Sequence, residues 1–316
     1  MRNMVRAAAA VALIGGAANA AAAIQPNGAP PIAPITGSIR PPAETIEQLR
    51  MRAEGGDRGA QLDLGLRLLE TADPAQHAEA RRWFQRASDA GHPEAKNALA
   101  TVLMYGRGGP ADEALGRRLM EEAAREGSFG ANLSLAERYL RGAEGYPRDP
   151  GRALRHTRAA AASSGPGGLF AQWRLAMMHL HGVGTPRDPQ AAYRILVAAS
   201  DAGGVNAMIS RAVMLATGEG IVADPAAARL WYQRAAESGQ RGFEHGLRGW
   251  GAMLSVGQGG PADLPRGIAY LRIAAAANDE HASTILEQLE PRITAEVDGE
   301  AQRIAGEWMR RHLPTR

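Results

Sequence analysis

Apolar and small residues recur at helical spacing along this chain, most clearly in residues 171–203. In the first half of this stretch, they fall four, five and eight residues after the first position, which places them on one helix face: Ala171, Leu175, Ala176 and the pair His179–Leu180. Gly182 and Gly184 then predict a turn. Asp188-Pro189 predicts the start of a second helix, because Asp accepts from unpaired N–H groups and Pro tolerates the first helical position.

The same helix–loop–helix unit recurs at a nearly fixed spacing of 35 to 40 residues. First helices are expected to start at Ala60, Ala95, Ala131, Ala171, Ala207 and Gly246, with a truncated seventh at Ala282. Second helices are expected to stop at Gly91, Gly127, Gly165, Gly203, Gly239 and Asn278, since Gly and Asn tolerate the left-handed conformation that ends a helix. Such periodicity is typical of stacked repeats. We therefore predict an all-α fold, a right-handed α-solenoid of stacked antiparallel helix pairs.

Three motifs carry a resemblance to a known family: Leu64-Gly65, Gly218-Glu219-Gly220 and the segment 231–236. They resemble Sel1-like repeats, a tetratricopeptide-like family, over roughly residues 43–290. Tetratricopeptide repeats are about 34 residues long and lack the glycine-hinged insertion. The resemblance implies protein binding. Exported proteins similar to this family include periplasmic regulators of membrane sensor kinases, and cysteine-rich versions are linked to cell-wall or β-lactam chemistry.

The first twenty residues have the three parts of a secretory leader. Arg2 and Arg6 give the positive start, an alanine-rich apolar stretch follows, and the segment 18–20 is an A-x-A exit. A retained membrane anchor is the alternative, but the apolar stretch is short for a span, which needs about 20 apolar residues. We predict a signal peptide at 1–20, and hence a periplasmic or secreted protein without a membrane span after cleavage.

The remaining chain divides into three predicted parts. Residues 21–42 are rich in Pro, Gly and Ala and are expected to form a disordered linker. Residues 43–290 are expected to form the solenoid, and 291–316 a C-terminal capping helix, because solenoids need polar end caps. Alternatively, Trp308 and Met309 could make this last helix a docking site for a partner.

Composition and motifs argue against several kinds of chemistry. The 36 basic and 33 acidic residues give a net charge of +3, and no basic run is long enough to follow a phosphate backbone, so we expect no nucleic-acid partner. The absence of cysteine excludes disulfides and thiol catalysis. No phosphate-loop, zinc-protease or hydrolase motif occurs. His179 and His181 lie two apart on a helix and point to different sides. We predict no catalytic residue, cofactor or metal.

Binding residues are expected on the first helices, where positions two, three and six after each start face a groove in related helix-pair repeats. The candidates are Trp173, Arg174, Met177, Arg211, Glu137 and Ile209. Trp and Arg dominate many interfaces, and Met adapts to irregular partners. Packing in the core is the alternative for Trp173 and the methionines. Arg211 stands where other copies carry leucine, and a charge there is costly unless it is paired or extends outward; we expect its head to reach into the groove, and locally loosened packing is the alternative.

These features predict a monomeric, non-enzymatic scaffold for protein–protein interaction in the bacterial envelope. The specific hypothesis is a periplasmic regulator that binds a membrane sensor or another envelope protein. Two alternatives stay open: a cell-wall or β-lactam-related hydrolase of the Sel1-like type, and a secreted effector that binds a host protein.

Overall fold

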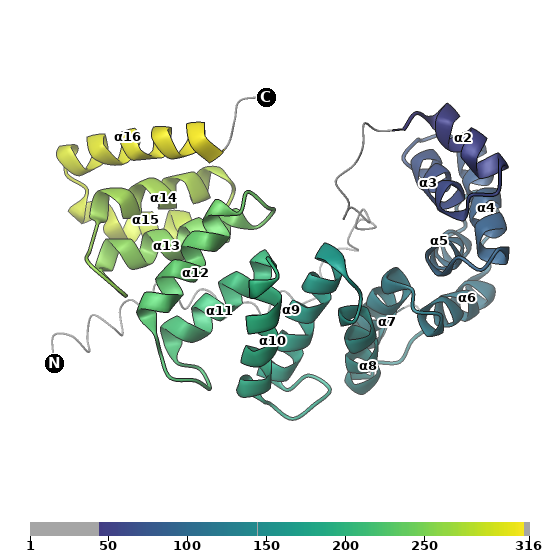
Figure 1. Cartoon of the computed structure of the whole chain (residues 1–316), viewed down its shortest axis with the longest axis horizontal. Helices are drawn as coiled ribbons and strands as arrows, with labels where there is room; N and C mark the ends of the chain where they lie inside the picture. Colours follow the sequence, from purple (N-terminus) through teal and green to yellow (C-terminus); the bar gives the residue numbers. More distant parts are fainter. Residues whose placement is uncertain (1–43, 144, 313–316) are drawn as a thin grey trace. The chain divides into compact units, whose positions relative to one another are not determined.

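A computed structural model describes residues 44–143 and 145–312, and all regular elements within these ranges are helical (Figure 1). The expected leader at 1–20 and linker at 21–42 lie outside them. The helices are α2 Ile46–Glu54, α3 Arg58–Leu69, α4 Pro74–Asp89, α5 Pro93–Met104, α6 Glu113–Arg125, α7 Phe129–Arg141, α8 Pro150–Ala161, α9 Gly165–His181, α10 Pro189–Asp201, α11 Val205–Thr217, α12 Pro225–Glu237, α13 Phe243–Val256, α14 Leu264–Ala276, α15 Glu280–Leu289, the 3-10 helix η2 Glu290–Arg292 and α16 Ala295–His312.

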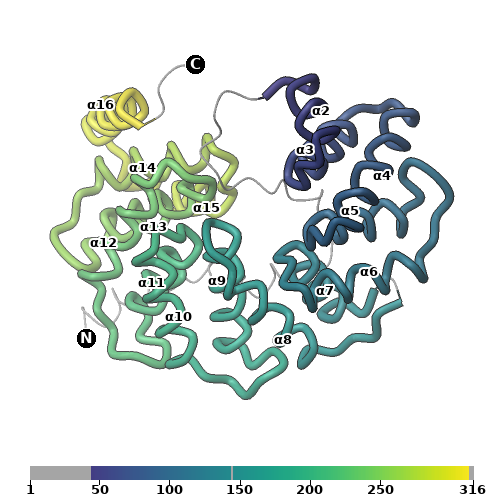
Figure 2. Tube along the Cα trace, turned by 45° about the vertical axis from the view of Figure 1, so that its right-hand side comes forward, coloured from purple at the N-terminus to yellow at the C-terminus, as the bar shows by residue number. Residues whose placement is uncertain are grey.

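The described chain divides into two compact units, and the boundary along the sequence falls within α9, between Leu175 and Ala176. The N-terminal unit holds the described residues up to Leu175 together with Val183–Thr185, and the C-terminal unit holds Ala176–Gly182 and the chain from Pro186 onward. In both units, consecutive helices pack side by side, as α3 with α4, α5 with α6, α11 with α12 and α13 with α14 (Figure 2). The predicted fold class is confirmed: an all-α solenoid of helix pairs.

Asp-initiated second helices are the most regular local feature. Asp149, Asp188 and Asp224 each accept a hydrogen bond from the backbone N–H three residues on, at 2.8–2.9 Å, and each is followed by Pro. Such a cap stabilises a helix by about 1 kcal/mol. Where the second helices end, the predicted left-handed residues are present, including Asn278 with φ of 67°. These sequence predictions are confirmed.

First helices begin earlier than predicted, because their capping residues lie upstream of the small residue used to align the copies. Asp57 caps α3 and Ser128 caps α7. The largest difference is in α9, which starts at Gly165 instead of Ala171. Pro166 suits the first helical turn, where its missing N–H costs nothing. The longer helix brings Phe170 onto α9, one turn before Trp173.

The hinge loops pack against the second helix of the preceding repeat. We call each such contact between a loop and the preceding second helix a seam. In four of the loops, the second glycine lies against the first turn of the second helix in the preceding repeat. A Cβ on Gly108 would lie 2.2 Å from the carbonyl oxygen of His77, and a Cβ on Gly259 would lie 2.1 Å from that of Pro225. Gly184 approaches the carbonyl oxygen of Pro150 in the same way, and a Cβ on Gly220 would lie 2.3 Å from the Cβ of Pro189. Glycine is therefore required both for its positive φ and for the contact that stacks one repeat on the next.

At the end of the described chain, α16 packs against α14. Its Trp308 is buried and stacks against Phe243, with ring centroids 6.0 Å apart. Met309, the next residue, is 41% exposed. Trp308 thus contributes to the core of the C-terminal unit, whereas the capping and docking hypotheses for this helix both stay predictions.

Candidate functional site

An aromatic pair lies on α9 in the N-terminal unit. Phe170 and Trp173 are one helical turn apart, their ring centroids are separated by 5.4 Å, and both side chains are partly exposed. Trp173 is therefore neither fully buried nor isolated. Large aromatic side chains that keep part of their surface exposed are the usual anchors of protein interfaces.

Arg174 follows Trp173 and joins α9 to the preceding first helix, α7. Its Nη2 donates to Glu137 Oε2 at 2.8 Å, and Arg141 Nε lies 2.6 Å from the other carboxylate oxygen of Glu137. Burial raises the pKa of Glu137, but the two arginines outweigh it and hold this pKa below its usual value. The two candidates Arg174 and Glu137 thus form one ion pair, which joins α9 to α7 close in sequence to the aromatic pair.

Met177 departs from the prediction. Its side chain is only 5% exposed, so it does not line an open surface, and the alternative of core packing holds for it. Met214 is also buried, at 1%. Met177 lies within a run of four consecutive buried residues on α9, Leu175 to Met178, so this part of the helix is covered on more than one side.

Arg211 also departs from the expectation of a groove-facing charge. On α11, its Nη1 donates to Ser200 Oγ at 3.0 Å and to Asp201 Oδ1 at 2.7 Å. Its guanidinium carbon lies 4.0 Å from the ring centroid of Trp231, in cation–π contact. Only 15% of its side chain is exposed. An arginine is tolerated here in place of leucine because a carboxylate and a hydroxyl accept from its Nη1 and an indole ring covers its guanidinium, although its buried Nε has no hydrogen-bond partner among the described residues.

Ile209, the last of the six candidates, is partly buried against the core of the C-terminal unit. The six therefore fall into two sets. Trp173, Arg174 and Glu137 form one partly exposed surface with Phe170 in the N-terminal unit, which we call the α9 surface. Met177, Arg211 and Ile209 belong to the C-terminal unit, and their side chains are mostly covered by packing within that unit.

Two clusters with perturbed pKa values were not identified from the sequence. Burial raises the pKa of Tyr146 to about 12. Burial also lowers the pKa of His156, whose ring stacks on Tyr139 at 5.7 Å and whose Nδ1 lies 3.0 Å from Asn132 Oδ1. Asn132 uses its amide nitrogen to bond two backbone carbonyls of the N-terminal unit. These bonds give the cluster a role in joining helices.

Asp279 anchors the second such cluster, in the C-terminal unit. It caps α15 through Ala282 N–H at 3.1 Å, and it lies 2.7 Å from His245 Nδ1 and 3.1 Å from Arg248 Nη1. Burial raises the pKa of Asp279, but the bonds from His245 and Arg248 outweigh it and leave this pKa below its usual value. The Asn278-Asp279 pair, a left-handed residue followed by a helix cap, is the sequence signal that could have revealed it.

Neither a metal site nor a membrane span emerges from the described part of the chain. No group of three or more His, Asp or Glu side chains in residues 44–143 and 145–312 is placed to hold a metal ion. In the same ranges, no helix combines the length and apolar character that crossing a bilayer requires.

The helix pairs and the close glycine contacts between successive repeats define an α-solenoid of stacked repeats. The Sel1 repeat family model matches six segments: residues 59–92, 93–128, 130–164, 169–204, 205–240 and 245–279. The chain therefore belongs to the Sel1-repeat family, and the predicted resemblance is confirmed, with six repeats in the predicted places. Proteins of this family generally act as interaction scaffolds.

A solved structure at 26% identity supports the fold. The chain is similar to a protective antigen of uropathogenic Escherichia coli with an SLR fold, at 26% identity and a TM-score of 0.65, over 84% of this chain. The match spans 57% of the length of that antigen. A Sel1 repeat protein from Oxalobacter formigenes is 28% identical, with a TM-score of 0.46 over 77% of this chain and 79% of the other.

Proposed function

We propose that this chain is a non-enzymatic scaffold of the bacterial envelope that regulates a membrane sensor or another envelope protein by binding it through the α9 surface. The observation that carries the proposal is the partly exposed Phe170–Trp173 pair beside Arg174. Arg174 is already held by Glu137, so it loses little side-chain freedom when a partner docks.

Export is the second part of the proposal. It rests on the leader-like first twenty residues and on the structural neighbour described as a protective antigen of uropathogenic Escherichia coli. Binding rather than catalysis is supported by the perturbed groups. Tyr146, His156 and Asp279 all have packing or capping partners that account for their pKa values.

Affinity capture tests the binding surface. The full chain, immobilised through a C-terminal tag, is incubated with a detergent-solubilised envelope fraction, and retained proteins are identified by mass spectrometry. Trp173→Ala removes the anchor, while Leu230→Ala serves as the matched control, because Leu230 is a 59% exposed apolar residue on α12. We expect an envelope protein that the original chain and the control retain and Trp173→Ala loses.

Two results would contradict the proposal. Retention of the same envelope proteins by Trp173→Ala and by the original chain would remove the α9 surface from the binding mechanism. Recovery of the chain in the cytoplasmic fraction, after expression with its own leader in a Gram-negative host, would remove the envelope from the proposal. In that case, only the general role of a protein-binding scaffold would remain.

A further inference from the structure

Arginines lie beneath three of the hinge loops. In the seam between α4 and the loop after α5, Arg81 Nη1 donates to the carbonyl of Pro110 at 3.0 Å. Between α12 and the loop after α13, Arg229 Nη1 donates to the carbonyl of Pro261 at the same distance. Both guanidiniums occupy the space where a side chain on the loop would stand: a Cβ on Gly109 or Gly260 would lie 2.8 Å from Nη1. Arg117 fills the corresponding space under Gly145.

The seam between α10 and the loop after α11 is built differently. Tyr193 holds the helix position of Arg81 and Arg229, four residues after the point that the loop glycine touches, here Pro189. Ile221 and Val222 replace the Gly-Pro pair of the loop. A guanidinium and the Ile221 side chain would compete for one space, so the two substitutions belong together. In the seam at α8, the helix position holds Leu154, which is buried.

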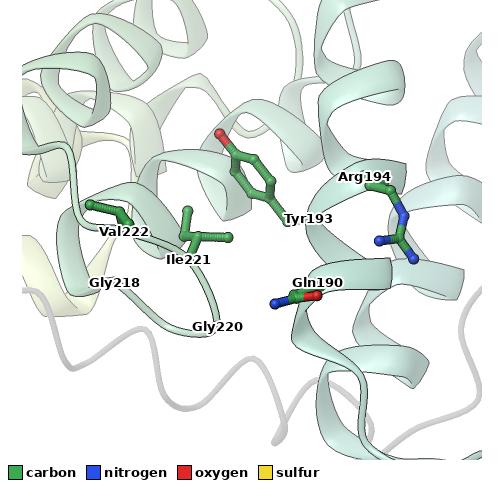
Figure 3. A pocket seen from close by; sticks show the side chains of 7 residues that line it. All are labelled: Gln190, Tyr193, Arg194, Gly218, Gly220, Ile221 and Val222. Atoms are coloured by element: carbon green, nitrogen blue, oxygen red, sulfur yellow. The ribbon is translucent and has the colours of Figure 1, made fainter.

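This substitution leaves a hollow of about 710 Å³, which we call the α10 hollow. Gln190, Tyr193 and Arg194 line it from α10, and the loop contributes Gly218, Gly220, Ile221 and Val222 (Figure 3). The arginine-to-carbonyl bond that closes the seams at Pro110 and Pro261 has no counterpart here among the described residues. The α10 hollow therefore lies at a contact between loop and helix that no arginine fills.

Its lining has a defined chemistry. Val222 is 91% exposed, an unusual state for a large apolar side chain, and it stands beside the partly buried Ile221 and Tyr193. Arg194, also exposed, makes no ion pair with any residue that the structure describes, and no acidic residue lines the hollow. The nearest loop carboxylate, Glu219, is bonded to Arg187. The hollow thus combines apolar surface with an uncompensated positive charge.

We propose that the α10 hollow binds a short acidic–apolar segment of a partner protein, with an apolar side chain covering Tyr193, Ile221 and Val222 and a carboxylate pairing with Arg194. This inference rests on the proposed protein-binding function and adds a second surface, in the C-terminal unit. Charge complementarity selects the carboxylate, and exposed apolar area selects the neighbouring side chain.

Labelled heptapeptides test the proposal by fluorescence polarisation with the full chain. One set carries Leu, Ile, Val, Phe or Met followed by two Glu; a second replaces both Glu with Lys, and a third replaces the apolar residue with Ser. We expect binding of members of the first set only. Val222→Ser and Arg194→Glu are each expected to weaken it about tenfold, the effect of losing one well-buried contact, while Leu230→Ser, on exposed α12 surface, leaves it unchanged.

A closing variant keeps the test independent of damage to the fold. Tyr193→Arg combined with Ile221→Gly and Val222→Pro rebuilds the seam of Arg229 and Pro261. It is expected to abolish peptide binding while leaving the melting temperature equal or higher. Arg194→Glu is expected to transfer preference to the lysine set.

Binding of the lysine set by the original chain, binding that survives the closing variant, or no binding by the first set would each overturn the inference. Because these measurements do not involve Trp173, partner capture through the α9 surface can succeed where the hollow fails, and the reverse.

Discussion

Two tryptophan–arginine pairs in this protein have the same residue types but different surroundings: one is partly exposed on α9, and the other is packed between helices of the C-terminal unit. On α9, Trp173 and Arg174 are adjacent in sequence, partly exposed, and oriented by Phe170 and Glu137. In the C-terminal unit, Arg211 and Trp231 come from α11 and α12, and the ring of Trp231 is only 8% exposed. The partners differ: Arg211 donates to Ser200 and Asp201 and lies over the ring of Trp231, whereas Arg174 donates to Glu137 on α7.

Residue type alone therefore does not distinguish a residue that anchors an interface from one that packs helices together. A guanidinium over an indole ring contributes about 0.5–2 kcal/mol, depending on how far it is desolvated. In the C-terminal unit, this energy holds the helices together. On α9, the aromatic area that remains exposed is still available to a partner. The two arrangements should therefore respond oppositely to the same truncation.

Trp231→Ala is expected to give the largest effect, a loss of about 3 kcal/mol in the free energy of unfolding, because it empties a packed site and leaves Arg211 without its ring. Urea denaturation followed by circular dichroism measures it. Partner and peptide affinity, measured where the variant is folded, is expected to change little. A loss below 1 kcal/mol would mean that Trp231 packs less firmly than its burial indicates.

Trp173→Ala is expected to weaken partner binding by about 2 kcal/mol, a typical cost for an interface anchor. Its melting temperature is expected to stay close to that of the original chain. Isothermal titration calorimetry with the captured envelope protein gives the affinity. Unchanged affinity with a large fall in thermal stability would show that Trp173 belongs to the core, and the contrast with Trp231 would disappear.

Sequence periodicity predicted the fold well because each repeat restates the same constraints. Asp caps, left-handed glycines and buried alanines recur in copy after copy, so an error in one is corrected by the others. Asn278 illustrates this: its position in the repeat, together with the tolerance of Asn for positive φ, identified it as left-handed. The start of α9 was misplaced because its Gly165-Pro166 opening departs from the other copies.

The candidate site was less predictable, because it depends on contacts between helices. Arg174 and Glu137 were both identified, but nothing in their 37-residue separation shows that they pair. Arg211 was recognised as an anomaly, but the residues that contact its guanidinium, Ser200 and Trp231, lie on two other helices. Met177 was misassigned because helical position alone does not report how closely the neighbouring helix approaches.

The ion pair on the α9 surface gives the next test. A double-mutant cycle with Arg174→Ala and Glu137→Ala is expected to yield a coupling free energy of about 1 kcal/mol in urea denaturation, since both side chains are mostly covered. The corresponding cycle with Arg211→Ala and Asp201→Ala is expected to give less, because Asp201 is 57% exposed and solvent screens the pair. Equal couplings would remove this distinction between the two arginines.

The acid sensitivity of the Arg174–Glu137 pair is the smallest expected effect. The pKa of Glu137 is lowered in the folded chain despite burial, because Arg174 and Arg141 favour its charged form. A lowered folded pKa means that the contribution of this carboxylate to stability is complete above the usual glutamate range, near about pH 4, and is lost as the pH falls through the folded value. Glu137→Gln cannot titrate, so the stability difference between it and the original chain is expected to shrink with acidification. Urea denaturation at a series of pH values measures this difference. A constant difference across the acid range would mean that Arg174 does not hold Glu137 ionised, and Arg174 would then lack the fixed orientation on which the α9 surface depends.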